Sequence, residues 1–506
     1  MGKLLPTFKT AIIDEITTSI SSNTSQYYAF AAFSGNTPST TSDDSFINGW
    51  QTVFGKKLGV GDIFPVISTK MWTTNTVYDI YDNHVDLANS DFYAISQTGG
   101  YYHIYKCMDN ANGAVSISNP SSVALPTQAE TFQTADNYKW KYITSVSSAV
   151  YNSFATTEYF PIYTNNSILA TAPNTSGVDT ILISNSGIGY NAYHNGTVQL
   201  VNTSLIQIES TAVATNTYYN DNSIYLINNN TPSSSQLLVV NDYVSNSSGR
   251  WIYVDGVPNT SIIQAGVTQY IISPRIKFNS DGTTDPQAYS VMNTSSNSIA
   301  DIIIINSGSN ITWANVTVVS NSNYGTGANV QAIVPPIGGH GSDPAGELFV
   351  KGMAINFKFS NSESNTIITN SSYNRIGLIK NPYSMTTAGA KGTRYSANIF
   401  SQVLKATLSP VLSSLFAVGS TVSGNTSGAV GTVVFCNTST VYLTGDKNFS
   451  NNEYITSSNG SVTTTLVINT LGDVYTKGIK PIYVQTINTV ARTNTQNEAF
   501  KLTIQI

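Results

Sequence analysis

The sequence predicts a mainly β protein of several domains, with a β-sandwich-like core, one N-terminal helix and small inserted β domains. Charged residues make up only 10% of the 506 residues, so Ser, Thr, Asn and Tyr carry much of the polarity. Short hydroxyl and amide side chains suit turns and the solvent faces of sheets better than helix surfaces. Segments of alternating β-branched and polar residues also recur between Asn, Ser and Gly clusters, which is the pattern of strands and hairpins.

The first element is expected to be a helix over Pro6–Ser21. Ile12, Ile13, Ile16 and Ile20 fall on one face of such a helix. The pattern then changes to short strands, which predicts a β domain that contains one helix. The expected strands of this region are Tyr27–Phe33, Tyr78–Tyr81, Phe92–Ile95, Tyr101–Cys107 and Trp140–Val146.

An internal repeat marks the middle of the chain. The segment Ile181–Gly187 (ILISNSG) recurs as Ile303–Gly308 (IIINSG), and each copy is followed by a further β-rich segment. Two copies are too few for a solenoid. We therefore expect two related small β units, each packing sheet on sheet, with the polar segment Thr203–Gln269 inserted between them. Units this small are marginal alone, so they should lean on each other or on a neighbouring protein and project from the core as peripheral contact domains.

Changes in composition give the expected domain boundaries. The Gly-rich stretch Gly338–Pro344 marks a junction, after which Gly352–Phe359 and Arg375–Lys380 are expected to return to the sheets of the first domain. The last strand, Phe500–Ile506, alternates apolar and polar residues and should have one buried face. The expected domains are a core at 1–165, a repeat-containing insert at 166–336, a return to the core at 337–402, a small β insert at 403–472 and C-terminal core strands at 473–506.

Charge and composition argue against several classes of protein. A net charge of −5, with Lys56-Lys57 as the densest basic cluster, gives no electrostatic footprint for nucleic acid. No apolar run approaches the ~18–20 residues that span a bilayer, and the start of the chain lacks the apolar core of a signal peptide. We therefore expect folding in the cytoplasm, no membrane insertion, and Cys107 and Cys436 as buried reduced thiols.

Four groups of residues, in order along the chain, carry a resemblance to a known family. They are Lys70–Thr73 with Val77–Asp82, Tyr105–Asp109, Asp136–Tyr142, and the terminal stretch around Arg492 and Gln496–Glu498. In this order they resemble the baseplate wedge proteins of T-even-like contractile-tailed bacteriophages, specifically the product of gene eight. The positions that carry the motifs are Trp72, Tyr105, Cys107, Asp109, Tyr138 and Trp140. The resemblance covers residues 1–165 and 475–506, and the middle of the chain looks like insertions.

This resemblance implies a structural protein without enzymatic activity, cofactor or metal. Members of the family are β-rich and dimerise within a wedge, where they brace the peripheral wedge subunits. The implied location is the virion, in the tail baseplate, after assembly in the host cytoplasm. The implied partners are a second copy of the chain, as a homodimer, and other baseplate wedge proteins. The departure from the family is size, because the inserts could add contacts that shorter members lack.

The loop around His340 is the most suggestive candidate for a binding site. Gly338, Gly339 and Gly341 would let backbone N–H groups converge on an anion, which makes Gly339, His340 and Asp343 a candidate contact loop. Glycines equally supply the positive φ of a tight connection. The sequence lacks a nucleophile elbow, and none of the four histidines has a second ligand at metal spacing, so a simple connection is favoured.

The segment Asp109–Gly113 has the composition of the start of a calcium loop. A complete loop needs a bidentate Glu at its last position, where this chain has Pro120, so the metal site is not expected. A hairpin turn at Asn112-Gly113 is expected instead.

Two other classes of function stay open. A receptor-binding or adhesin protein that recognises host surface glycan would explain the β-rich inserts and the 30 Tyr, 19 Phe and 5 Trp. The scatter of these aromatic residues along strands favours a core and subunit interface over a sugar-binding surface. A glycan-degrading tail enzyme would need paired carboxylates in a cleft, which the scarcity of acidic residues disfavours.

Overall fold

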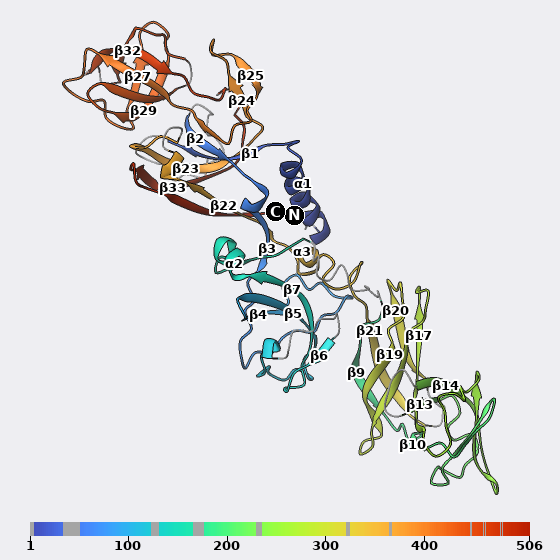
Figure 1. The fold of residues 1–506 in the computed structure, drawn as a ribbon. Coiled ribbons are helices and arrows are strands. Elements are labelled where there is room, and N and C mark those ends of the chain that lie inside the picture. The colour runs from blue at the N-terminus through green and yellow to red at the C-terminus, as the bar shows by residue number, and fades with distance from the viewer. Residues whose placement is uncertain are drawn as a thin grey trace. The chain divides into compact units, whose positions relative to one another are not determined.

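A computed structural model describes most of the chain. The described residues are 5–33, 51–122, 131–164, 177–228, 235–319, 324–363, 367–445, 448–458, 460, 462–475, 477 and 479–506. They form a mainly β protein with many sheets and one N-terminal helix (Figure 1), so the predicted fold class is confirmed. The chain divides into two compact units. Unit 1 is Met1–Ser68, Ala149–Ile162 and Val350–Ile506, and unit 2 is Thr69–Ser148 and Tyr163–Phe349.

This division differs from the expected core at 1–165. Residues 69–148 group with the middle of the chain and not with the N-terminal strands. The N-terminal strands at 27–32 and 63–66 pair instead with strands at 375–380 and 352–355. Residues 69–148 make their contacts with residues 163–349. Long-range pairing of this kind cannot be deduced from strand patterns alone.

Unit 1 is built on two sheets. The first has the order β26 (Ile399–Ser401), β2 (Thr52–Lys57), β1 (Tyr27–Ala32), β23 (Ser371–Lys380) and β33 (Pro481–Arg492). The second has the order β34 (Glu498–Gln505), β22 (Gly352–Phe359), β3 (Ile63–Ser68) and β8 (Tyr159–Pro161). Phe54 on β2 meets Phe359 on β22 edge to face, with ring centroids 4.8 Å apart, so aromatic rings join the two sheets.

The helix α1 covers residues Pro6–Ser21, as predicted. Its isoleucine face is turned inward, because Ile13 and Ile20 are buried, and α1 packs on β3 and β22. A second short helix, α2 (Ser148–Phe154), contributes Phe154 to a small core with Val66 and Ala354.

A closed six-stranded barrel occupies residues 404–470 of unit 1. Its strand order is β27 (Leu404–Ser409), β30 (Thr440–Gly445), β29 (Val430–Cys436), β28 (Thr421–Gly424), β31 (Glu453–Ser457) and β32 (Thr463–Thr470), seen in Figure 1 in orange and red. The barrel has an apolar core of its own. Closure leaves it with no sheet edge, which suits a small inserted domain.

Unit 2 begins with an antiparallel sheet of the order β4 (Tyr93–Thr98), β5 (Tyr101–Asp109), β7 (Lys139–Ser147) and β6 (Thr131–Gln133). The expected strand Tyr78–Tyr81 is wrong, because this segment is irregular and only isolated bonds hold it, such as Tyr81 N–H to the Cys107 carbonyl at 2.8 Å. The Asp79 carboxylate accepts hydrogen bonds from Ser90 and from the Asp91 N–H. These side-chain bonds replace a regular ladder.

The two repeat copies lie in one sandwich. The first copy is in β9 (Thr180–Ile188), which pairs with β21 (Thr326–Ile333). The second is in β19 (Ser298–Asn306), at the edge of a sheet with β18 (Gln287–Asn293), β17 (Arg275–Ser280) and β20 (Ala314–Val319). Ile181 of the first copy belongs to a buried core against which Ile304 of the second copy packs. The two copies therefore lean on each other, as expected for units too small to bury an apolar face alone.

A seven-stranded sheet with its own core forms the insert between the copies. Its order is β10 (His194–Thr197), β16 (Gln269–Ser273), β13 (Ser223–Ile227), β14 (Ser235–Asn246), β15 (Gly249–Asp255), β12 (Leu205–Ile208) and β11 (Leu200–Val201). The inserted unit thus runs from His194 to Ser273, wider than the expected Thr203–Gln269. The β-rich segment expected after the first repeat copy contains β11, but the pairing that joins β10, β11 and β16 to the insert depends on long-range contacts.

Candidate functional site

The motif positions gather in one aromatic core in unit 2. Trp72, Tyr105, Cys107, Tyr138 and Trp140 all belong to this cluster, together with Tyr78, Ala94, Ala111, Phe132 and Tyr142. The rings of Tyr138 and Trp140 stack with centroids 5.5 Å apart. Positions far apart in the sequence therefore meet at one place.

Strand pairing explains why these residues meet. Cys107 on β5 lies directly opposite Trp140 on β7, and Tyr138 is two residues before Trp140, so both rings face the same side. The Cys107 side chain is fully buried. Burial raises the pKa of this thiol well above its ordinary value. Cys107 is therefore a packing residue, as predicted, whereas Cys436 is only half-buried, which corrects the expectation for the second thiol.

Asp109, the remaining motif position, ends β5 and begins a turn. Its carboxylate accepts a hydrogen bond from the Ala111 N–H at 2.9 Å. Ala111, Asn112 and Gly113 have φ values of 52°, 61° and 78°, so the turn passes through three left-handed residues, where Asn and Gly are tolerated best. The turn is not a hairpin, because β5 pairs with β4 and β7 and not with the segment that follows.

A polar cleft lies beside this turn. Its volume is about 680 Å³. Residues from two parts of unit 2, 80–139 and 181–331, line it, and they include Asp82, Asn112, Gln133, Ile183 and Gln331. Lys139 stands in it between two carboxylates, 3.5 Å from Asp109 and 3.7 Å from Asp301. The lining offers amide and carboxylate groups that can bind hydroxyl groups of a neutral polar ligand.

The His340 loop leads to a buried ionic cluster, which consists of Lys106, Lys141, Asp179, His340 and Glu347. Lys106 Nζ donates to the Glu347 carboxylate, and both side chains are almost completely buried. His340 places Nδ1 against Glu347 and Nε2 against Asp179. Lys141 Nζ donates to Asp179 over 3.2 Å. Each buried charge thus has an opposite charge beside it, as low-polarity surroundings require.

The position of the proton on the His340 imidazole decides which hydrogen bond its Nδ1 makes. Nδ1 of His340 is 3.0 Å from Lys106 Nζ and also in contact with Glu347. It accepts a hydrogen bond from Lys106 when it carries no proton, and it donates to Glu347 when it does. The Tyr81 ring completes the enclosure, with its centroid 3.7 Å from Lys106 Nζ.

Burial and ion pairing shift the pKa values of the Asp179 and Glu347 carboxyl groups in opposite directions. Burial alone would raise the pKa of Asp179, but His340 and Lys141 outweigh it and lower the pKa to about 2. Lys106 and His340 outweigh burial in the same way at Glu347, whose pKa is also about 2. Burial lowers the pKa of Lys106, against the opposing effect of Glu347.

Two of the three residues of the candidate contact loop are buried. His340 and Gly339 are buried, and the Asp343 side chain accepts from the Gly346 N–H at 2.9 Å, which caps the short helix α3 (Pro344–Glu347). The His340 imidazole therefore faces inward. The sequence singled out His340 but not its partners, and the one available signal was Lys106, a lysine between the apolar pairs Ile104-Tyr105 and Cys107-Met108.

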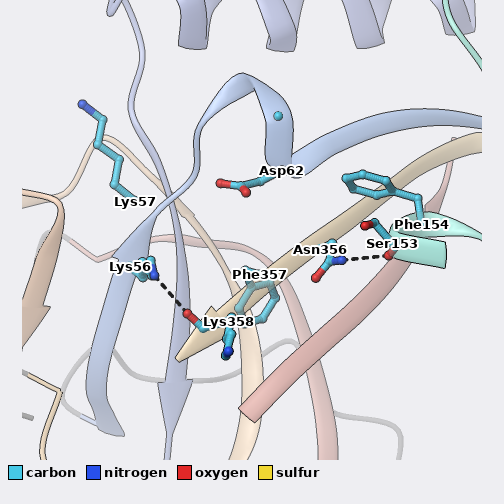
Figure 2. A pocket seen from close by; sticks show the side chains of 9 residues that line it. Lys56, Lys57, Asp62, Ser153, Phe154, Asn356, Phe357 and Lys358 are labelled. Atoms are coloured by element: carbon cyan, nitrogen blue, oxygen red, sulfur yellow. Dashed lines mark hydrogen bonds between the residues drawn. The ribbon is translucent and has the colours of Figure 1, made fainter. Parts of the chain in front are cut away.

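The basic cluster Lys56-Lys57 lines a pocket of about 280 Å³ in unit 1, with Asp62, Phe154 and Lys358 among its other residues (Figure 2). Lys56 Nζ donates to the Lys358 carbonyl at 3.1 Å and pairs with Glu363 at 2.7 Å. Lys57 extends away from the other two lysines and donates to Asn23. Two of the three ammonium groups are thus already engaged with the protein, which disfavours an anion site here.

The described residues contain no group of three or more His, Cys, Asp or Glu side chains arranged to hold a metal ion. None of the helices in the described ranges is long and apolar enough to cross a bilayer. No protein-family model matches the chain, and a search of curated proteins found no match.

Proposed function

We propose that this chain is a structural subunit of a contractile phage tail baseplate wedge, where it braces peripheral wedge proteins for attachment and sheath contraction. The observation that supports this most is the aromatic core. Five of the six motif positions that resemble the wedge family pack together there, although Trp72 and Trp140 lie in different segments of the sequence. Motifs that serve as a shared core indicate a common domain more strongly than matching residues at scattered places.

The buried ionic cluster supports a bracing role. It joins β5 and β7 to the segment before β9 and to the His340 loop, so it fixes the repeat sandwich to the aromatic sheet inside unit 2. A subunit that transmits force between neighbours needs domains that keep their relative orientation. Buried charge pairs specify one arrangement, because any other arrangement leaves a charge unpaired.

The test is the location of the protein in purified virions. Antibody labelling, followed by a reconstruction of the tail, should place the protein in the baseplate ring in several symmetric copies. Labelling at fibre tips, or absence of the chain from purified tails, would overturn the proposal.

A second candidate function is recognition of host surface glycan. The polar cleft beside Asp109 favours it, since amide and carboxylate groups bind sugar hydroxyls and the volume of about 680 Å³ admits a short oligosaccharide. Binding of the purified chain to a glycan array, weakened at least tenfold by Asn112→Ala together with Gln133→Ala, would support this function. Equal binding by the double variant would argue against the cleft.

A further inference from the structure

The polar cleft beside Asp109 carries more negative than positive charge. Three carboxylates line it, those of Asp82, Asp109 and Asp301. Lys139 supplies the one ammonium group among the described lining residues, so the formal net charge of the lining is −2. His84, which contacts Asp82 from outside the lining, adds a positive charge only when it is protonated. The charge of the cleft therefore favours a cationic occupant.

Lys139 does not cancel this negative charge. Its Nζ lies 3.5 Å from Asp109 and 3.7 Å from Asp301, and both separations are longer than an ordinary hydrogen bond. The Ala111 N–H fixes one oxygen of Asp109 at 2.9 Å. The Ile302 N–H fixes one oxygen of Asp301 at 2.8 Å. These two bonds hold the carboxylates in place, and both keep a negative charge that a second cation can share.

Acceptor oxygens without a partner complete the described lining. The Asp82 carboxylate receives hydrogen bonds from the His84 N–H and from Gln331 at Oδ1, and its Oδ2 has no partner among the described residues. The exposed Asn112 amide makes no hydrogen bond within the described part of the chain. Gln133 donates through Nε2, and its carbonyl oxygen bonds to none of the described residues. A cation with several N–H donors needs acceptors of this kind.

Aliphatic side chains form another part of the lining. Ile80, Leu182 and Ile183 are half-buried residues of the cleft. The described lining includes no aromatic ring on which a sugar could stack. A side chain with a long apolar stem and a charged head suits this mixture, because the stem packs on the aliphatic groups while the head meets the carboxylates.

We propose that the cleft receives an arginine side chain presented by a partner protein. A guanidinium group has N–H donors in fixed directions and is weakly hydrated, so it can bind a carboxylate and amide oxygens together. The inference rests on the proposed function only in taking the chain as a subunit that binds other proteins. The competing occupant is a saccharide, as in the second candidate function.

A minimal probe tests the requirement for charge. In saturation-transfer NMR titrations, N-acetyl-arginine methylamide should bind the full chain about fivefold to tenfold more tightly than N-acetyl-citrulline methylamide. Citrulline is the control because it has nearly the same shape without the charge. Equal affinity for the two probes, or no binding of either, would overturn the proposal. Tighter binding of N-acetylated chitotriose than of the arginine probe would overturn it in favour of the saccharide.

Two substitutions with opposite expected effects locate the binding site. Asp301→Asn removes one negative charge, so the affinity for the arginine probe should fall about threefold to fivefold. Lys139→Gln removes the resident cation, so that affinity should rise by a similar factor. A general loss of structure would lower the affinity in both variants, and the rise in Lys139→Gln therefore separates charge from stability.

The matched control for these substitutions is Asp255→Asn, because Asp255 is exposed and lies outside the lining. This variant should bind the arginine probe like the original chain. The same affinity in all three variants would place the binding of arginine elsewhere and overturn the assignment of the cleft.

The outcomes also separate this site from the proposed function. Charge-selective binding by a chain that is absent from baseplates would leave the arginine site and remove the wedge assignment. A chain in the baseplate ring whose cleft does not distinguish arginine from citrulline would keep the wedge assignment and lose the arginine site.

Discussion

Arg492 donates through Nε to the carboxylate of Glu498 at 2.9 Å, across the turn that joins β33 to β34, and both side chains are buried. The other guanidinium nitrogens donate to three backbone carbonyls, those of Ser360, Ile367 and Ile368. A planar guanidinium has donors in the fixed directions that such a clamp needs. One side chain thus holds the ends of both sheets of unit 1 to the connection between β22 and β23.

Removing this clamp should destabilise unit 1 strongly. We expect Arg492→Ala to lower the free energy of unfolding by about 3–5 kcal/mol, because Glu498 is left as an unpaired buried charge and three carbonyls lose their donor. Urea denaturation followed by fluorescence measures the loss. The matched control is Arg394→Ala, since Arg394 is exposed and donates to a single carbonyl. The control should cost less than about 1 kcal/mol, and equal losses would contradict the prediction.

The same comparison can be made with lysines in unit 2. Lys106→Met should cost about 3–5 kcal/mol, since Glu347 loses its buried cationic partner. Lys139→Met should cost about 1 kcal/mol or less, because Lys139 is partly exposed and its two ion pairs are long. Differential scanning calorimetry should show a lower melting temperature for the first variant alone. Similar shifts of the melting temperature in both variants would mean that the buried cluster contributes no more to stability than the ion pairs of Lys139.

The cluster also predicts how stability depends on pH. The pKa of Glu347 is about 2 in the folded chain and near 4.5 when unperturbed, so its stabilisation is complete above the higher value and is lost as the pH falls toward the lower one. Glu347→Gln removes this contribution while Lys106, Lys141, Asp179, His340 and Tyr81 remain.

The stability gap between the original chain and Glu347→Gln should therefore be widest near neutral pH and narrow steadily below about pH 4.5. Urea midpoints measured at several pH values provide the test. A gap that stays constant down to the lowest pH at which the chain folds would contradict the depressed pKa.

The two thiols should differ in reactivity. Cys107 is fully buried and its pKa is raised well above the ordinary value, so it should resist thiol reagents until the chain unfolds. Cys436 is half-buried, and its pKa is raised by burial, so it should react slowly in the native state. Labelling with Ellman's reagent should then be abolished in native Cys436→Ser and unchanged in Cys107→Ala. Fast labelling of native Cys436→Ser would contradict the buried position of Cys107.

The insert between the repeats should be removable at its structural boundaries. His194 on β10 lies opposite Ile272 on β16, so the first and last strands of the inserted segment are neighbours. Replacing residues 194–272 by a short Gly-Ser linker should leave the repeat sandwich folded, because that sandwich has a separate core. Deleting Thr203–Gln269 instead removes the partner of β11 and leaves β10 and the rest of β16 as an isolated pair, so we expect that variant to aggregate. The reverse order of solubility would show that the boundaries are wrong.

The sequence predicted local structure well where one pattern was sufficient. The helix expected over Pro6–Ser21 has the bounds of α1, and the strand expected over Gly352–Phe359 has those of β22. It failed at Tyr78–Tyr81, whose composition suits a strand, because side-chain bonds from Asp79 compete with a ladder. For the two repeat copies it predicted mutual support between small units, but not that their strands line a single core.

What the sequence determined by itself is the β-rich class, the helix and the set of residues that favour burial, since these follow from composition and short-range periodicity. The tertiary structure alone decided which segments meet. Lys106, Asp179 and His340 have no common spacing, and only the fold brings their charges together. The same holds for Arg492, whose carbonyl partners lie more than a hundred residues earlier in the chain. Contacts of this kind depend on long-range packing, which local patterns do not encode.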